Sequence, residues 1–176
     1  MIGNNLNFAG SEGQLLISSL EEEWFFQGKS FAFEDYFSFS TDETKTFVLD
    51  PTAFTGDRIV NIPIILYSTG GPFLANIYVG TDADDDGTLL TAVNRRIGFP
   101  APKSIIRLNP TVNSNGLRIG GDIVTGTGNN PATATGGSNI GVLPIELSTT
   151  LKTMITLENT DGDGIYCQIK FTWFEI

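Results

Sequence analysis

Apolar and polar residues alternate with a period of two through most of the chain that follows Gly28. In the segment FAFEDYFSFS, one face carries Phe31, Phe33, Asp35, Phe37 and Phe39. This alternation is the pattern of a β-strand with one buried face. The same period recurs in KTFVLD, RIVNIPIILYS, FLANIYVGT and TLKTMITLE. The sequence therefore predicts a chain built mainly of β-strands.

The last two predicted strands, TLKTMITLE and IYCQIKFTWFEI, are interpreted as a hairpin because the turn-forming segment NTDGDG separates them. One face of the final strand carries Ile165, Cys167, Ile169, Phe171 and Trp173. Cys167 is therefore interpreted as a small core residue and not as a nucleophile. A register slipped by one residue would place Phe174 inside in place of Trp173.

One short helix is predicted at 19–27, in the segment SSLEEEWFFQG. Ser19 and Glu22 have the spacing of a capping box, and Gly28 can adopt the left-handed conformation that ends a helix. The alternative is a strand through the apolar run WFF. Both interpretations end at Gly28, so the strand pattern begins after it.

Two interruptions of the strand pattern each lead to a separate prediction. Pro63 lies inside RIVNIPIILYS and has no N–H to donate, so this strand is predicted to be an edge strand or to be bulged there. The segment at 126–141, GTGNNPATATGGSNIG, has almost no apolar residue and is predicted to be an exposed, mobile loop.

Together these elements predict an all-β fold, an antiparallel β-sandwich of jelly-roll type with one short N-terminal helix. Residues 1–17 are mostly polar and are predicted to form an extended N-terminal arm. Residues 18–176 are predicted to form a single domain, which is a usual length for one hydrophobic core.

Composition excludes most catalytic classes. The chain has no His and one Cys, so Ser-His-Asp and Cys-His catalysis, internal disulfides and multi-Cys metal sites are excluded. Two acid pairs stay open for glycoside hydrolysis, Glu34 with Asp35 and Asp84 with Asp86, because two carboxylates need only be close in space. The sequence predicts that the protein is not an enzyme and needs no cofactor.

Tyrosines offer a different kind of candidate site. Tyr36, Tyr67 and Tyr78 occupy outward positions of predicted strands. They either line a platform for sugars or pack along the sheet surface.

One acidic segment resembles a calcium loop. Asp82, Asp84 and Asp86 supply oxygens at relative positions one, three and five, with a glycine at six, and NTDGDG repeats this spacing. The acid expected at position twelve is replaced by Val93 in the first segment and by Lys170 in the second. Both segments are therefore interpreted as hairpin turns, in which Asp-Gly is favoured, with calcium at the first as the alternative.

The charge is strongly acidic and uneven. The net charge is −10, which disfavours nucleic acid as a partner. Residues 87–121 nevertheless contain no acid and hold five cations, namely Arg95, Arg96, Lys103, Arg107 and Arg118. This pattern is either ordinary surface variation or an acidic surface that meets a basic one across subunits.

The start of the chain lacks the basic and apolar regions of a secretory signal, and no apolar run approaches the length of a membrane span. The sequence therefore predicts a soluble protein that is made in a cytoplasm and does not bind membranes. An unpaired cysteine agrees with a reducing compartment.

Several segments carry a family resemblance: SSLEEEWFFQGKSFAF, the long run from KTFVLD to YVGTD, the triplet NRR, and the closing TLKTMITLENT and IKFTWFE. With them the chain resembles small head-decoration, or cement, proteins of tailed bacteriophages. The resemblance implies a β-sandwich or jelly roll, commonly trimeric, that sits on the capsid lattice and bridges capsomers. It brings no catalytic residue.

The expectation that follows is a non-enzymatic virion protein on the capsid surface, made in the host cytoplasm, that stabilises the mature head. Its expected partners are the major capsid protein and its own copies in a homotrimer. The alternative is a receptor- or carbohydrate-binding module of a head fibre or tail, and a glycan-active enzyme is a third hypothesis. The expected contact residues come from the arm and from the NRR triplet: Asn4, Asn5, Leu6, Phe8, Arg95 and Arg96.

Overall fold

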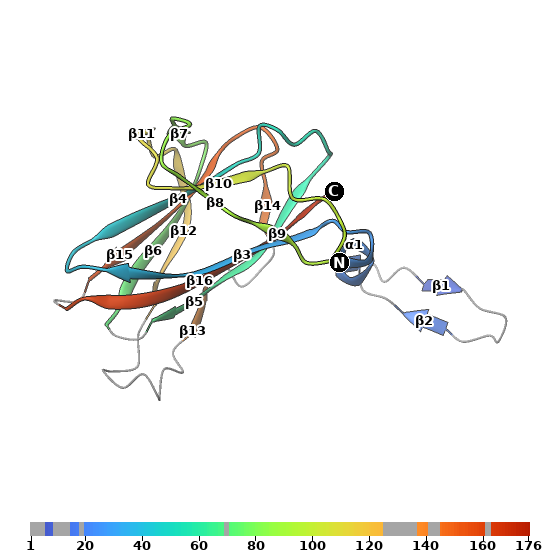
Figure 1. Cartoon of the computed structure of the whole chain (residues 1–176), viewed down its shortest axis with the longest axis horizontal. Helices are drawn as coiled ribbons and strands as arrows, with labels where there is room; N and C mark the ends of the chain where they lie inside the picture. The colour runs from blue at the N-terminus through green and yellow to red at the C-terminus, as the bar shows by residue number, and fades with distance from the viewer. Residues whose placement is uncertain are drawn as a thin grey trace.

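The computed structural model is an antiparallel β-sandwich, as the sequence predicts (Figure 1). The structure describes residues 6–8, 15–17, 20–68, 71–124, 137–140, 145–160 and 163–176. Within these residues, two six-stranded sheets form the body and two further pairs of strands lie outside them.

The two sheets of the body are called sheet 1 and sheet 2. Sheet 1 has the order β12-β6-β15-β4-β10-β8, and its strands are, in that order, Leu117–Val124, Phe73–Val79, Thr153–Asn159, Thr44–Asp50, Ile105–Leu108 and Thr88–Leu90. Sheet 2 has the order β13-β5-β16-β3-β9, with β14 also paired to β5. Its strands are Gly137–Ile140, Ile59–Ser68, Ile165–Glu175, Ser30–Phe39 and Val93–Asn94, and β14 is Ile145–Leu147.

From β3 to β6 successive strands alternate between the two sheets, and β15 and β16 again lie in different sheets, as expected for the jelly-roll class. The prediction of a hairpin at the C-terminus is therefore wrong. β15 pairs with β4 and β6 in sheet 1, whereas β16 pairs with β3 and β5 in sheet 2. β15 and β16 each have one apolar face. Because they lie in opposite sheets, these two faces point toward each other in the core. Two strands paired within one sheet would not face each other in this way.

Asn159 fixes the corner at which the chain changes sheets. Its buried side-chain Nδ2 donates to the carbonyl oxygens of Ser40 at 2.8 Å and Asp163 at 2.9 Å. Its backbone N–H donates to the carbonyl of Glu43 at 2.9 Å. The corner is thereby tied to the turn between β3 and β4. The second calcium-like segment is this corner, although residues 161 and 162 within it lie outside the described residues.

The core consists of the alternating inward residues of both sheets. The predicted inward face of the last strand is confirmed, because all of its members are buried: Ile165, Cys167, Ile169, Phe171 and Trp173. Phe174, on the opposite face of β16, is buried too and packs on Trp24 with ring centroids 5.1 Å apart. The end of β16 is thus covered on both faces, by the sandwich core and by a helix.

That helix is α1, Leu20–Phe26, within one residue of the predicted bounds at each end. Gly28 has a φ of 70°, and its N–H donates to the carbonyl of Phe25 while that of Lys29 donates to Trp24. This pair of hydrogen bonds is the Schellman motif, which confirms the predicted glycine stop. Ser19, the predicted cap, lies outside the described residues.

β5 is bulged at Pro63 and is not an edge strand. It pairs with β16 on one side and with β13 and β14 on the other. Its register with β16 shifts where Ile62 lies opposite Thr172 and Ile65 lies opposite Lys170. The extra residue of the bulge accommodates a proline inside a central strand.

The predicted loop at 126–141 is corrected at its end. β13, Gly137–Ile140, pairs with β5, so these residues form a strand and not a loop. A backbone ladder needs no apolar side chain, which is why composition failed to indicate it. The remaining residues of the predicted loop lie outside the described residues.

Two pairs of strands lie outside the sandwich sheets. In the N-terminal arm, β1, Leu6–Phe8, pairs with β2, Leu15–Ile17, beyond α1 (Figure 1). β7, Asp82–Ala83, pairs with β11, Val112–Ser114, and Ala83 packs with Val48 and Met154 in a small second core. In the part of the chain that the structure describes, no helix has the length and apolarity to span a membrane.

Candidate functional site

A short loop at 95–100 follows β9 and is held against the end of α1. The side-chain Nδ2 of Asn94 donates to the carbonyl oxygens of Gly28 at 2.7 Å and Pro100 at 2.9 Å. The Oδ1 of the same residue accepts the N–H of Arg96 at 2.9 Å. One half-buried amide group therefore bridges both ends of the loop and the helix stop. The Phe99 ring packs so closely on Gly28 that a Cβ there has no room.

Ile97, at the tip of this loop, is 99% exposed. Phe26 of α1, Val93 of β9 and Phe99 are exposed as well. Four apolar side chains from one helix, one strand and one loop are thus presented to solvent around a backbone that Asn94 fixes. Apolar groups gathered on a fixed surface mark sites of protein–protein contact.

The predicted contact residues Arg95 and Arg96 belong to this end of the molecule. The Arg96 guanidinium lies over the Phe99 ring, 4.3 Å from its centroid, and that of Arg95 lies 5.7 Å from the centroid of Phe25. Arg95 also donates through Nη1 to the Ser30 hydroxyl at 3.3 Å. These contacts hold Arg96 beside the exposed Phe99 and Arg95 beside the half-buried Phe25. Cations packed on aromatic rings are enriched at binding hot spots.

The predicted contact residues of the arm are only partly described. Leu6 and Phe8 lie in β1, where Leu6 is opposite Ile17 and Phe8 is opposite Leu15. Their side chains, and all of Asn4 and Asn5, lie outside the described residues.

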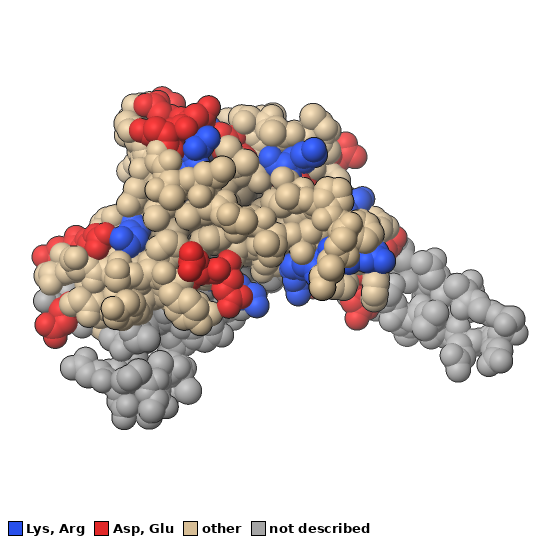
Figure 2. Space-filling view, viewed as in Figure 1, with Lys and Arg blue, Asp and Glu red and all other residues tan. Residues whose placement is uncertain are grey.

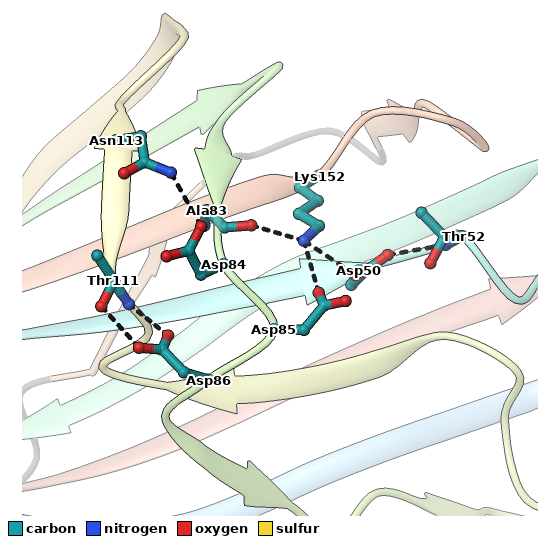
Figure 3. Close-up of polar contacts among 9 residues, drawn as sticks. All are labelled: Asp50, Thr52, Ala83, Asp84, Asp85, Asp86, Thr111, Asn113 and Lys152. Atoms are coloured by element: carbon teal, nitrogen blue, oxygen red, sulfur yellow. Dashed lines mark hydrogen bonds and ion pairs between the residues drawn. The ribbon is translucent and has the colours of Figure 1, made fainter.

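The acidic segment 82–86 lies at the other end of the sandwich, and Asp84, Asp85 and Asp86 have separate partners (Figure 3). Asp84 accepts a hydrogen bond from Asn113 at 3.0 Å, and Asp86 accepts two from Thr111, each at 2.6 Å. The bonds from the Thr111 hydroxyl and then its N–H lower the pKa of Asp86. Among the described residues, no three His, Cys, Asp or Glu side chains form a group that could hold a metal ion. β7 pairs with β11, whereas β8 pairs with β10, so the segment between them is not the hairpin turn that the sequence predicted.

Lys152 connects this segment to sheet 1 (Figure 3). Its Nζ lies 2.9 Å from an oxygen of Asp85, 3.2 Å from one of Asp50 and 2.7 Å from the carbonyl of Ala83. Burial by itself raises the pKa of Asp50, but the hydrogen bonds from Thr52 and the Lys152 ammonium outweigh it, so the pKa is lowered. In the folded state the Lys152 ammonium therefore favours the ionised form of Asp50.

Charge is distributed unevenly over the surface. Figure 2 shows Asp and Glu gathered around β7 and β11 and Lys and Arg gathered around the loop that follows β9. The five cations of the acid-free stretch do not form one patch, however. Arg107 lies in β10, and Arg118 lies in β12, where its Nε donates to Asn76 at 2.8 Å. The basic surface is thus smaller than the sequence indicated.

Within each of the two candidate acid pairs, the two carboxylates bond to different partners. Glu34 accepts a hydrogen bond from Gln168 at 2.7 Å, whereas Asp35, on the other side of the strand, accepts the N–H of Tyr36. Asp84 and Asp86 bond to different residues of β11 and its approach, as described above. The members of each candidate pair are thus held by different partners.

The tyrosines separate into different environments. Tyr36 is exposed on sheet 2, Tyr78 is half-buried against the small second core, and the side chain of Tyr67 lies outside the described residues. Sequence reasoning missed Tyr166, which is exposed on β16 next to the outward residues of β3. The signal was present, because Tyr166 alternates with the inward Ile165 and Cys167.

Comparison of the chain with protein-family models finds no match. Comparison with curated protein sequences finds none either. The functional argument therefore depends on the residues and their geometry.

Proposed function

We propose that this chain is a non-enzymatic structural protein of a bacteriophage virion that decorates the capsid and stabilises the mature head. In this proposal it is made in the host cytoplasm and binds the major capsid protein and its own copies. The resemblance of its sequence to decoration proteins supports the proposal, and so does the all-β sandwich.

The observation that carries the proposal is the exposed isoleucine on a fixed loop. Burying one isoleucine side chain contributes about 1.5–3 kcal/mol, and Ile97 leaves all of this unrealised in the single chain. Because Asn94 already holds the loop in place, a partner that covers Ile97 has little conformational entropy to remove. Arg95 and Arg96 beside it favour an acidic partner surface.

Stabilisation of the head would follow from mass action. A protein that binds only the assembled, expanded shell stabilises that state in proportion to its occupancy and affinity. Many identical contacts spread over the lattice would oppose internal pressure. This mechanism needs no reacting group.

We expect purified protein to rebind capsids that lack it and to raise the temperature at which they are disrupted. Ile97→Asp should weaken this rebinding by about tenfold or more, because it places a carboxylate in the apolar centre of the contact. Removing residues 1–17 should also weaken it while the sandwich stays folded, since the arm adds no core. Cosedimentation with capsids measures binding, and thermal melting of the free protein checks folding.

Leu117→Asp is the matched control, because Leu117 is an exposed apolar residue on β12 in the other sheet. It should rebind as well as the unmodified protein. Equal binding by Ile97→Asp would contradict the assignment of this end, and finding the protein only at a tail tip would contradict decoration.

We expect a homotrimer in solution. A closed ring of three identical subunits needs two different surfaces that complement each other. The acids around β7 and β11 and the cations around the loop after β9 are such a pair (Figure 2). Light scattering should give the trimer mass at low salt and a smaller mass at high salt, where the charges are screened. A monomer at high concentration in low salt would contradict this expectation.

A further inference from the structure

The outer face of sheet 2 carries two exposed tyrosines on neighbouring strands. Tyr36 of β3 is 67% exposed and Tyr166 of β16 is 61% exposed. Tyr36 lies opposite Gln168, and Tyr166 lies opposite Ser38, so the two tyrosines are diagonal neighbours. Diagonal neighbours in an antiparallel pair are about 7–8 Å apart, within reach of one ligand of two or more rings.

Polar groups lie between and beside these rings. Gln168 follows Tyr166 on the same face, and its Nε2 donates to Glu34 Oε1 at 2.7 Å. The other oxygen of Glu34 lies 3.8 Å from Lys170 Nζ. The row therefore presents amide and carboxylate oxygens that are already fixed in place, and such oxygens have further capacity to accept hydrogen bonds.

A hollow of about 250 Å³ opens beside Tyr166. The residues that line it include two serines and a tyrosine: Ser38, Phe39, Ser40, Gly164, Ile165 and Tyr166. At about 30 Å³ for each water, this is space for several waters, and a ligand with hydroxyl groups could replace them.

We propose that this face binds a neutral oligosaccharide. A pyranose ring has an apolar C–H face that stacks on tyrosine and a rim of hydroxyls that bond to amide and carboxylate groups, and both kinds of partner are present. The ligand is neutral because Glu34 beside the rings and the net charge of −10 disfavour acidic sugars. This inference does not depend on the proposed capsid contact, which uses α1 and the loop after β9.

Titration with single oligosaccharides tests the proposal. Chitotetraose, cellotetraose, maltotetraose and mannotetraose are each added to the full chain, with sialyllactose as an anionic probe, and binding is followed by calorimetry and amide NMR shifts. We expect at least one neutral sugar to bind and to shift the amides of Tyr36, Tyr166 and Gln168. Tyr36→Ala and Tyr166→Ala should each weaken binding by about tenfold.

Tyr36→Phe and Tyr166→Phe retain a stacking ring and should keep most of the affinity. Phe26→Ala, at an exposed ring on α1, should leave sugar binding unchanged. The tyrosine variants should still rebind capsids, which separates this inference from the proposed function. Failure of all four neutral sugars to bind, binding that survives both alanine variants, or a preference for sialyllactose would each overturn the proposal.

Discussion

Replacing Trp173 by alanine is expected to lower the free energy of unfolding by about 3–5 kcal/mol. The side chain is 0% exposed, and its ring packs against Phe31 and Phe171 with centroids 5.9 and 5.3 Å away. Its Nε1 also donates to the buried carboxylate of Glu175 at 3.2 Å. Removing the ring therefore leaves a cavity and takes one donor from a buried charge. Chemical denaturation measures the loss, and the melting temperature should fall by roughly 10 °C.

Phe26→Ala is a suitable control for this experiment because it also removes an aromatic ring, but from an exposed position on α1. Its effect on stability should stay within about 0.5 kcal/mol. If Trp173→Ala unfolded at the same denaturant concentration as the unmodified protein, the sandwich core would not be centred on this face of β16.

The sequence predicted which residues face the core but not which strands lie side by side. Alternation identifies Cys167 and Trp173 as inward, because the period of a strand is a local property. Alternation does not indicate which strands pair with each other. The turn-like segment at Asn159 therefore predicts a hairpin, whereas in the structure it is a corner between the two sheets. The contacts that decide between these, from Asn159 to Ser40 and Glu43, join residues more than a hundred positions apart.

The candidate site was predicted in part for a similar reason. Arg95 and Arg96 could be chosen because the acid-free stretch and the NRR triplet stand out in the sequence. Ile97 could not, because an exposed isoleucine and a buried one look the same in a sequence. Its exposure depends on the bonds of Asn94 to Gly28 and Pro100, which only the fold brings together.

The acidic segment shows that the partners of charged residues also cannot be predicted from sequence spacing alone. The spacing of Asp82, Asp84 and Asp86 suggested a shared ion, although the missing acid at position twelve favoured a turn. In the fold, residues of β11 and its approach, together with Lys152, engage this segment individually (Figure 3). The pattern of acids thus indicated neither strand β7 nor the lysine that anchors the segment.

Lys152→Met is expected to lower the free energy of unfolding by about 3 kcal/mol at pH 7, because it leaves a buried charge without its partner. Asp50 is 3% exposed, and the Lys152 ammonium 3.2 Å away offsets the cost of burying it. Methionine keeps most of the volume of the side chain, so the loss reports mainly on charge. Chemical denaturation of both proteins across a range of pH values measures it.

The pH dependence of this loss has a definite sign. The pKa of Asp50 is lowered from its ordinary 3.8, so its contribution is present above that value and is lost as pH falls through the lowered pKa. Without the ammonium, burial is opposed only by the bonds from Thr52, and the pKa of Asp50 in the variant moves upward. The difference in stability between the two proteins should therefore be largest near neutral pH and shrink as the solution becomes acidic.

At alkaline pH, the loss of the proton from Lys152 ends the contribution of the ion pair to stability. Burial tends to lower the pKa of Lys152, but its hydrogen bonds to Asp85 and Asp50 outweigh burial and raise the pKa above 10.5. Its contribution is therefore complete below that value and is lost as pH rises through the raised pKa. Asp85→Asn is the matched control: Asp85 is 74% exposed, and an ion pair in solvent contributes at most about 1 kcal/mol. A loss in Asp85→Asn as large as that in Lys152→Met, or a loss in Lys152→Met that grows in acid, would contradict the assignment of the buried pair with Asp50.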